Sequence, residues 1–88
     1  MNWKHEINIK TALYEAKELL DGGVAEAATI QRLGTAVADK LATLPPKVQA
    51  AFTPLQTRFR RVRSRRGCDA LLAELYDLAD HEKVWLGL

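Results

Sequence analysis

Apolar residues recur at helical spacing along most of the chain. Near the start they fall at intervals of four, three and four residues, at Ile9, Leu13, Ala16 and Leu20. This spacing is typical of one face of a helix. We therefore predict a first helix that starts at Lys4 or Lys10 and ends at Leu20. The following Asp21-Gly22-Gly23 favours a stop, because glycine readily takes the left-handed conformation that closes a helix.

A second helix is predicted from about Val24 to Leu44. Its apolar residues include Ile30, Val37 and Leu44, which lie seven positions apart. Gly34 falls in the middle, where glycine costs about 1 kcal/mol relative to alanine. A close crossing with another helix would explain it. Pro45-Pro46 ends the segment, since neither proline can donate a backbone hydrogen bond.

The third segment allows two interpretations. Thr53-Pro54-Leu55-Gln56 has the sequence of a capping box, with threonine as N-cap and proline at the first helical position. It favours a short helix over 46–52 and a new one from Pro54 to Arg66, ended by Gly67. The alternative is one long helix from Pro46 that is kinked at Pro54.

A last helix is predicted to start at Asp69, a good N-cap residue, and to end between Lys83 and Leu86. Its apolar stripe consists of Leu71, Leu75 and Leu78, and it is widened by Leu72, Tyr76 and Ala79. Together the segments predict an all-α fold. Residues 1–88 should form a single domain, a bundle of four helices whose third segment is split or kinked at Pro54.

Composition agrees with a small helical domain. Alanine and leucine supply thirteen residues each, and 48% of the chain is hydrophobic. The single cysteine, Cys68, excludes an intramolecular disulfide. We read it as a small residue near a helix start, although Arg65 and Arg66 could lower the pKa of its thiol. With no secretory signal and no long apolar run, we expect a cytoplasmic protein that does not contact membranes.

Positive charge is concentrated in nine residues, 58–66, which contain six arginines: Arg58, Arg60, Arg61, Arg63, Arg65 and Arg66. The other 79 residues hold seven Lys or Arg against eleven Asp or Glu, a net charge of −4. The formal net charge of +2 therefore hides a polarised molecule. We predict that these arginines lie on one helix, whose apolar face (Leu55, Phe59 and Val62) holds it against the bundle.

Three roles are open for the arginines. They could bind nucleic-acid phosphates, because guanidinium groups hold phosphate in bidentate fashion. They could bind an acidic surface on a larger protein, which would make the chain an adaptor or inhibitor. They could also pair with the chain's own acidic last helix, through Glu74, Asp77 and Asp80. Nucleic-acid binding is our leading prediction, with the protein partner second and a homodimer as a further option.

The C-terminal tail, Val84-Trp85-Leu86-Gly87-Leu88, also allows two interpretations. It could fold back to close the core, with Trp3 packed against it. Alternatively, Trp85, Leu86 and Leu88 could form an apolar docking patch.

Catalysis has little support in this sequence. The two histidines, His5 and His81, are far apart, and no Cys/His spacing suits zinc. No glycine-rich phosphate loop is present. We therefore predict a non-enzymatic binding protein without a metal or cofactor.

Overall fold

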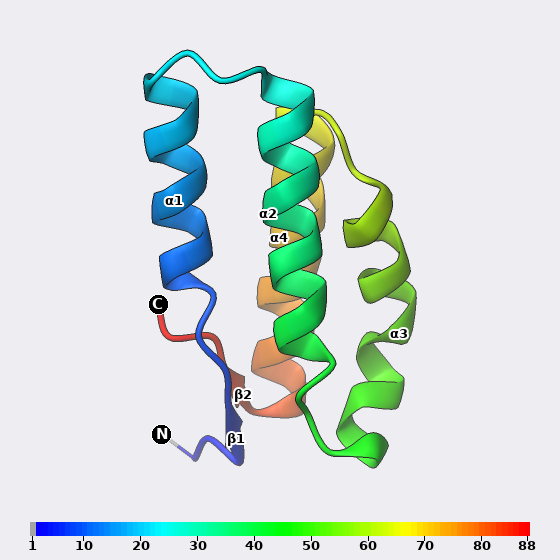
Figure 1. The fold of residues 1–88 in the computed structure, drawn as a ribbon. Helices are drawn as coiled ribbons and strands as arrows, with labels where there is room; N and C mark the ends of the chain where they lie inside the picture. Colours follow the sequence, from blue (N-terminus) through cyan, green and yellow to red (C-terminus); the bar gives the residue numbers. More distant parts are fainter. Residues whose placement is uncertain (1) are drawn as a thin grey trace.

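Four helices and a short strand pair make up residues 2–88, the part of the chain that this computed structural model describes (Figure 1). The helices are α1 (Lys10–Asp21), α2 (Glu26–Leu41), α3 (Pro46–Arg61) and α4 (Arg65–Glu82). The strands are β1 (His5–Glu6) and β2 (Val84–Trp85). The prediction of a helical bundle with four helices is confirmed, and α1 takes the later of its two predicted starts. None of these helices is long and apolar enough to cross a bilayer.

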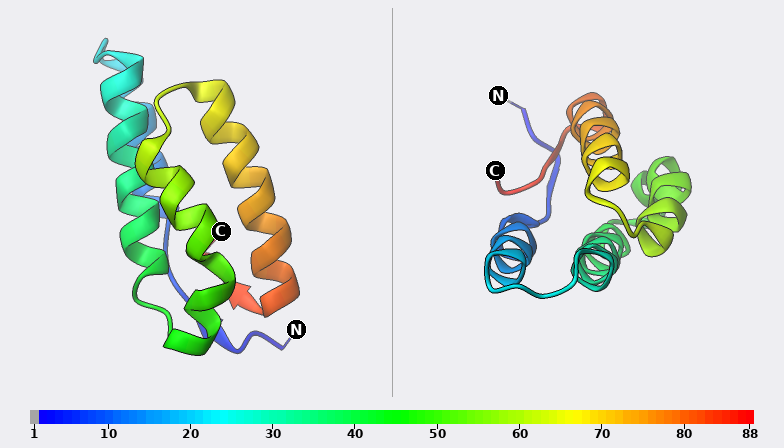
Figure 2. Two further views of the ribbon diagram at one scale, coloured as in Figure 1. Left: turned by 90° about the vertical axis from the view of Figure 1, so that its right-hand side faces the viewer. Right: turned by 90° about the horizontal axis from the view of Figure 1, so that it is seen from above.

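Helix α2 is the central element of the bundle. It contacts α1 on one side and both α3 and α4 on the other. Helix α1 has no such neighbour besides α2, since no Cα atom of α1 comes within 8 Å of one in α4. Seen from above in Figure 2, the two terminal segments of the chain pass between α1 and α4. The helices therefore contact one another in the order α1, α2, α3 and α4, without a direct contact between α1 and α4.

Gly34 sets the distance between α2 and α3. A Cβ atom at this position would collide with the backbone carbonyl oxygen of Phe59 and would lie 2.9 Å from Cγ1 of Val62. Phe59 is fully buried at this crossing. The predicted close crossing is confirmed, and it explains why a residue that disfavours helix occupies the middle of α2.

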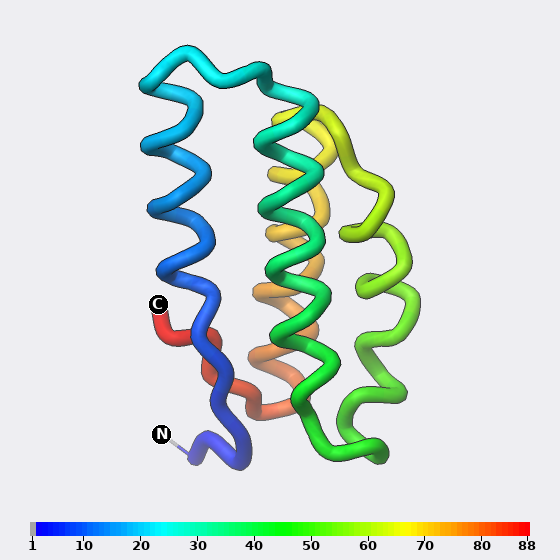
Figure 3. The backbone as a smooth tube through the Cα atoms, viewed as in Figure 1, coloured from blue at the N-terminus to red at the C-terminus, as the bar shows by residue number. Residues whose placement is uncertain are grey.

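Helix α3 continues through Pro54, so the alternative of one long helix is correct and the predicted start at Pro54 is wrong. Figure 3 traces the whole segment as successive turns of one helix. Thr53 does not cap a helix; its hydroxyl donates a 3.3 Å hydrogen bond to the carbonyl of Gln49, one turn back. Burial explains the continuity, because Phe52 and Leu55 flank Pro54 and both lie in the core. Pro54 itself is exposed, on the solvent side of the helix.

The N-cap of the last helix lies five residues earlier than predicted. Helix α3 ends at Arg61, Val62 is extended, and Ser64 is the N-cap of α4. The Ser64 hydroxyl accepts a 3.0 Å hydrogen bond from the N–H of Gly67, which removes the need for a cap at Asp69. Gly67 consequently lies inside α4 and does not end the preceding helix. The predicted helix from Pro54 to Arg66 does not exist.

The two ends of the chain are joined by β1 and β2, which pair in parallel with His5 opposite Val84. Ile7 donates a 2.9 Å hydrogen bond to the carbonyl of Trp85, and Ile9 donates a 3.0 Å bond to that of Leu86. Val84 and Leu86 are buried. The tail therefore folds back to close the core, as one of the two interpretations predicted, through a strand pair that the sequence did not indicate.

The Gly34 crossing leads to a prediction of stability. Gly34→Ala should lower the free energy of unfolding by about 2 kcal/mol, because the cost of overpacking against a backbone atom exceeds the gain in helix propensity. Urea unfolding followed by circular dichroism measures the change.

Gly22→Ala serves as the matched control. Gly22 has a φ of −81°, and a Cβ there would lie 3.2 Å from the carbonyl oxygen of Glu18, a much milder contact than at Gly34, so this variant should lose less stability than Gly34→Ala. Equal stability of the wild type and Gly34→Ala would show that the crossing relaxes without cost.

Candidate functional site

The six arginines are distributed over two helix ends and the link between them. Arg58, Arg60 and Arg61 occupy the last turn of α3, Arg63 lies in the link, and Arg65 and Arg66 begin α4. All six side chains are exposed. The structure thus gathers them around one corner of the bundle, whereas the sequence analysis placed them along one helix.

Arg58 is bound by the chain's own acidic helix. Its Nη1 donates a 2.9 Å hydrogen bond to Oε1 of Glu74, and its Nη2 lies 2.8 Å from Oε2. This bidentate contact lowers the pKa of the Glu74 carboxyl and raises that of the Arg58 guanidinium. The internal pairing that the sequence left open is therefore present for Arg58.

Arg60 is also paired within the chain. Its Nη2 lies 3.0 Å from Oδ1 of Asp39 on α2. Both side chains are largely exposed, so the contact adds little stability but does orient the guanidinium toward α2. Asp77 and Asp80, which the sequence also offered as partners, are not within 4.0 Å of any arginine among residues 2–88.

Four arginines remain without an ion pair in residues 2–88: Arg61, Arg63, Arg65 and Arg66. We call this set the arginine corner. It occupies six consecutive positions and contains no acidic residue. Arg65 and Arg66 also stand in the first turn of α4, where the helix dipole disfavours positive charge. A helix start with two arginines and no carboxylate is electrostatically suited to an anion.

Val62 fixes the direction of the arginine corner. Its side chain is partly buried against the core, close to Gly34 and Gly67. Because Val62 is extended and points inward, its neighbours Arg61 and Arg63 are directed to solvent. A Cβ at Gly67 would lie 3.3 Å from Cγ2 of Val62 and 2.9 Å from the Ser64 hydroxyl oxygen, so the capping hydroxyl would have to shift.

No family model, curated protein or solved structure matches this chain. Function is therefore inferred from the chain's own side chains.

The second predicted site, the C-terminal tail, is divided by burial. Leu86 is only 6% exposed and belongs to the core, so it is not available for docking. Trp85 and Leu88 are exposed and line a groove of about 470 Å³ together with Trp3 and Tyr76. Tyr76 was expected in the buried stripe of α4, but 41% of it is exposed. The sequence analysis missed its role because Tyr76 shares the helical spacing of the core leucines.

Cys68 is a core residue. It is 1% exposed, and burial together with neighbouring Asp69 raises the pKa of its thiol to about 11. Burial outweighs any effect of the nearby Arg65 and Arg66, whose side chains are exposed. The thiol stays protonated at neutral pH, as expected for a residue that only fills space.

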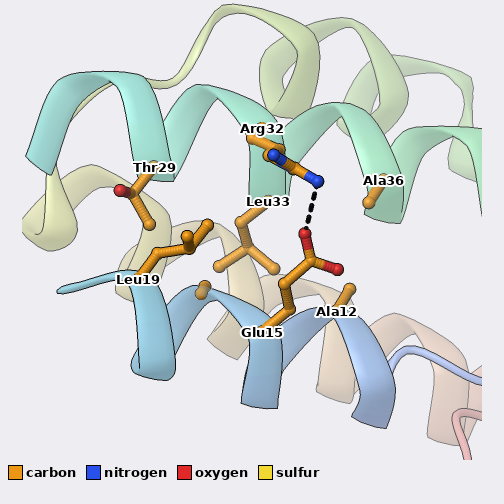
Figure 4. Close-up of a pocket in the computed structure, with 8 residues that line it drawn as sticks. Ala12, Glu15, Leu19, Thr29, Arg32, Leu33 and Ala36 are labelled. Carbon is orange, nitrogen blue, oxygen red and sulfur yellow. Dashed lines mark ion pairs between the residues drawn. The ribbon is translucent and has the colours of Figure 1, made fainter. Parts of the chain in front are cut away.

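A cavity of about 260 Å³ between α1 and α2 lies away from both predicted sites (Figure 4). Arg32 and Glu15 close it with a 2.7 Å ion pair, and its other lining side chains are apolar except for Thr29. The Thr29 hydroxyl donates to the carbonyl of Ala25, the N-cap residue of α2. This cavity therefore offers a ligand few free polar groups, and among residues 2–88 no three metal-ligating side chains converge.

The Arg58–Glu74 pair gives a titration that can be measured. In Arg58→Gln the pKa of Glu74 should rise toward its ordinary value, because the charged partner is lost. Since folding lowers this pKa, the pair contributes stability above the unfolded-state pKa and loses it as the pH falls through the folded-state pKa. Carboxyl-carbon NMR titration of both proteins measures the shift.

Arg61→Gln is the control for this titration. Arg61 has no ion pair in the described residues, so its loss should leave the Glu74 titration unchanged. An unchanged Glu74 pKa in Arg58→Gln would contradict the bidentate contact in solution.

Proposed function

We propose that this chain is a small non-enzymatic binding protein whose arginine corner contacts the phosphate groups of a nucleic acid. The observation that supports the proposal is the division of the arginines. Arg58 and Arg60 are paired internally, while four guanidinium groups within six residues have no partner in residues 2–88. Like charges so close together repel one another, so an anionic partner would relieve a cost that the fold leaves uncompensated.

Arginine is suited to this role in two ways. Each guanidinium can donate two parallel hydrogen bonds to a phosphate and can stack on an unpaired base. The corner contains arginine and no lysine, which favours contact geometry over charge alone. Binding of this kind would be salt-sensitive and largely independent of sequence.

An acidic protein surface is a second candidate partner, which would make the chain an adaptor or inhibitor. The observation that favours it is the absence of Asn and Gln side chains, which read adenine, at the corner. Positions 61–66 contain no Asn or Gln, and Gln56, the nearest glutamine, is buried in the bundle. Phosphate contacts position a protein on nucleic acid, but base contacts are what specify a sequence.

Fluorescence anisotropy with labelled single-stranded and duplex oligonucleotides tests the proposal. With four phosphate contacts, the logarithm of affinity for duplex DNA should fall with the logarithm of salt concentration at a slope of about −4. The triple variant Arg61→Gln/Arg63→Gln/Arg66→Gln should bind at least about tenfold more weakly, with a slope of about −1. Arg65 is left unchanged because it also lines a groove.

The matched control removes three arginines that are paired within the chain. Arg32→Gln/Arg58→Gln/Arg60→Gln loses the same formal charge but keeps the arginine corner intact. Equal loss of binding in both triple variants would show an effect of net charge alone and would contradict the corner. Absence of binding to every oligonucleotide at low salt would exclude nucleic acid as the partner.

A further inference from the structure

The groove of about 470 Å³ lies where the two ends of the chain meet the last turns of α4 (Figure 1). Three aromatic side chains line it, and each comes from a different segment: Trp3 from the N-terminal residues, Tyr76 from α4 and Trp85 from β2. All three remain partly exposed, at 37%, 41% and 40%. Accessible aromatic rings that gather around one hollow of this size indicate a binding site.

The strand pair holds Trp85 at this groove. Val84 and Leu86 are buried on either side of it, so the alternation of an extended chain directs Trp85 to the opposite, solvent side. The indole Nε1 of Trp85 donates a 3.3 Å hydrogen bond to the carbonyl of Leu88, which restrains the ring. Because Ala79, Val84 and Leu86 are buried lining residues, the inner surface of the groove is apolar.

One carboxylate also lines the groove. Asp80 follows Tyr76 by four residues, so the two side chains are neighbours on one face of α4. Asp80 has no ion pair within residues 2–88, and the part of the chain that the structure describes contributes no Lys or Arg to the lining. The groove therefore combines three aromatic rings with one unpaired negative charge.

This combination favours a cation that is also apolar. The face of an aromatic ring attracts cations, and tryptophan does so most strongly. A primary ammonium group brings three strongly hydrated N–H donors, and a mostly apolar lining offers them few acceptors. A quaternary ammonium group carries methyl groups in place of these donors. It can therefore contact the rings directly while the Asp80 carboxylate attracts its charge.

The surroundings of the groove favour a side chain on a larger partner over a free small molecule. The three rings are too exposed to enclose a ligand, whereas sites for small molecules bury most of the ligand surface. A second, mostly apolar groove adjoins this one at Leu88 and continues to Leu13 and Tyr14 on α1. It offers contact area to the residues that flank a bound side chain, which a free ammonium compound lacks.

We propose that this groove binds a trimethylated lysine side chain of a partner protein. The rings of Trp3, Tyr76 and Trp85 would contact its methyl groups, and the Asp80 carboxylate would balance its charge. The inference does not rest on the proposed function, because no residue of the arginine corner lines the groove. The two surfaces would bind groups of opposite charge.

Titration of the full chain with a short alanine peptide that contains one trimethyllysine tests the proposal. The readout is the indole N–H signals in proton–nitrogen NMR, because the chain has two tryptophans and both line the groove. Both signals should shift, with a dissociation constant in the millimolar range or below.

Three comparison ligands make this titration decisive. The same peptide with unmodified lysine, and one with an uncharged carbon isostere of trimethyllysine, should each bind at least about fivefold more weakly. Equal binding of any two of these peptides would overturn the proposal, because it would show that methyl groups or charge are not recognised. Choline should bind more weakly than the trimethyllysine peptide; equal or tighter binding of choline would overturn the assignment to a protein partner.

Two substitutions separate the charge of the groove from its rings. Asp80→Asn removes the negative charge with little change of shape, and Tyr76→Leu removes one ring but keeps an apolar side chain. Each should weaken binding of the trimethyllysine peptide by about fivefold. The amide spectrum of each variant confirms its fold.

Asp77→Asn and Tyr14→Leu are the matched controls. Both residues are exposed, Asp77 has no ion pair within residues 2–88, and neither residue lines this groove. Both controls should bind the trimethyllysine peptide as the wild type does. Equal weakening in a variant and its control would place the binding site elsewhere and refute the proposal.

Discussion

The close approach of α2 and α3 at Gly34 is the contact on which the rest of the arrangement depends. Because Gly34 has no side chain, the backbone at Phe59 rests directly against α2, and Val62 fits beside it. This contact fixes where α3 ends and where the chain turns toward Ser64. The arginine corner is therefore attached to a close helix crossing, although its own side chains are exposed. A binding surface on such a support loses little order when it meets a ligand.

Helix existence could be predicted from the spacing of apolar residues, but helix boundaries near the arginines could not. Thr53-Pro54 and Ser64 both carry the chemistry of an N-cap, and only burial decides between them. Phe52 and Leu55 must both reach the core, so the helix continues through Pro54. Val62 must reach it as well, which forces an extended residue after Arg61. Local sequence offers the alternatives, and tertiary packing selects one of them.

The candidate site shows a similar limit. The charge cluster is evident from the sequence, but its division into paired and unpaired arginines depends on distances between helices. Glu74 and Asp39 lie 16 and 21 residues from their partners, so no local pattern could identify them. The exposure of Tyr76 was missed for a related reason, since this residue shares the helical spacing of the core leucines.

The parallel pairing of β1 and β2 has a mechanical consequence. Tension applied to the two chain ends would pull β1 and β2 in opposite directions along their common axis. The hydrogen bonds from Lys4, Ile7 and Ile9 to the last strand and its flanks would then bear load together, and would not open one after another. The four-helix fold thus has a strand pair between its termini that is loaded in shear. A molecular motor that translocates the chain from either end would have to separate these two strands before it reached a helix.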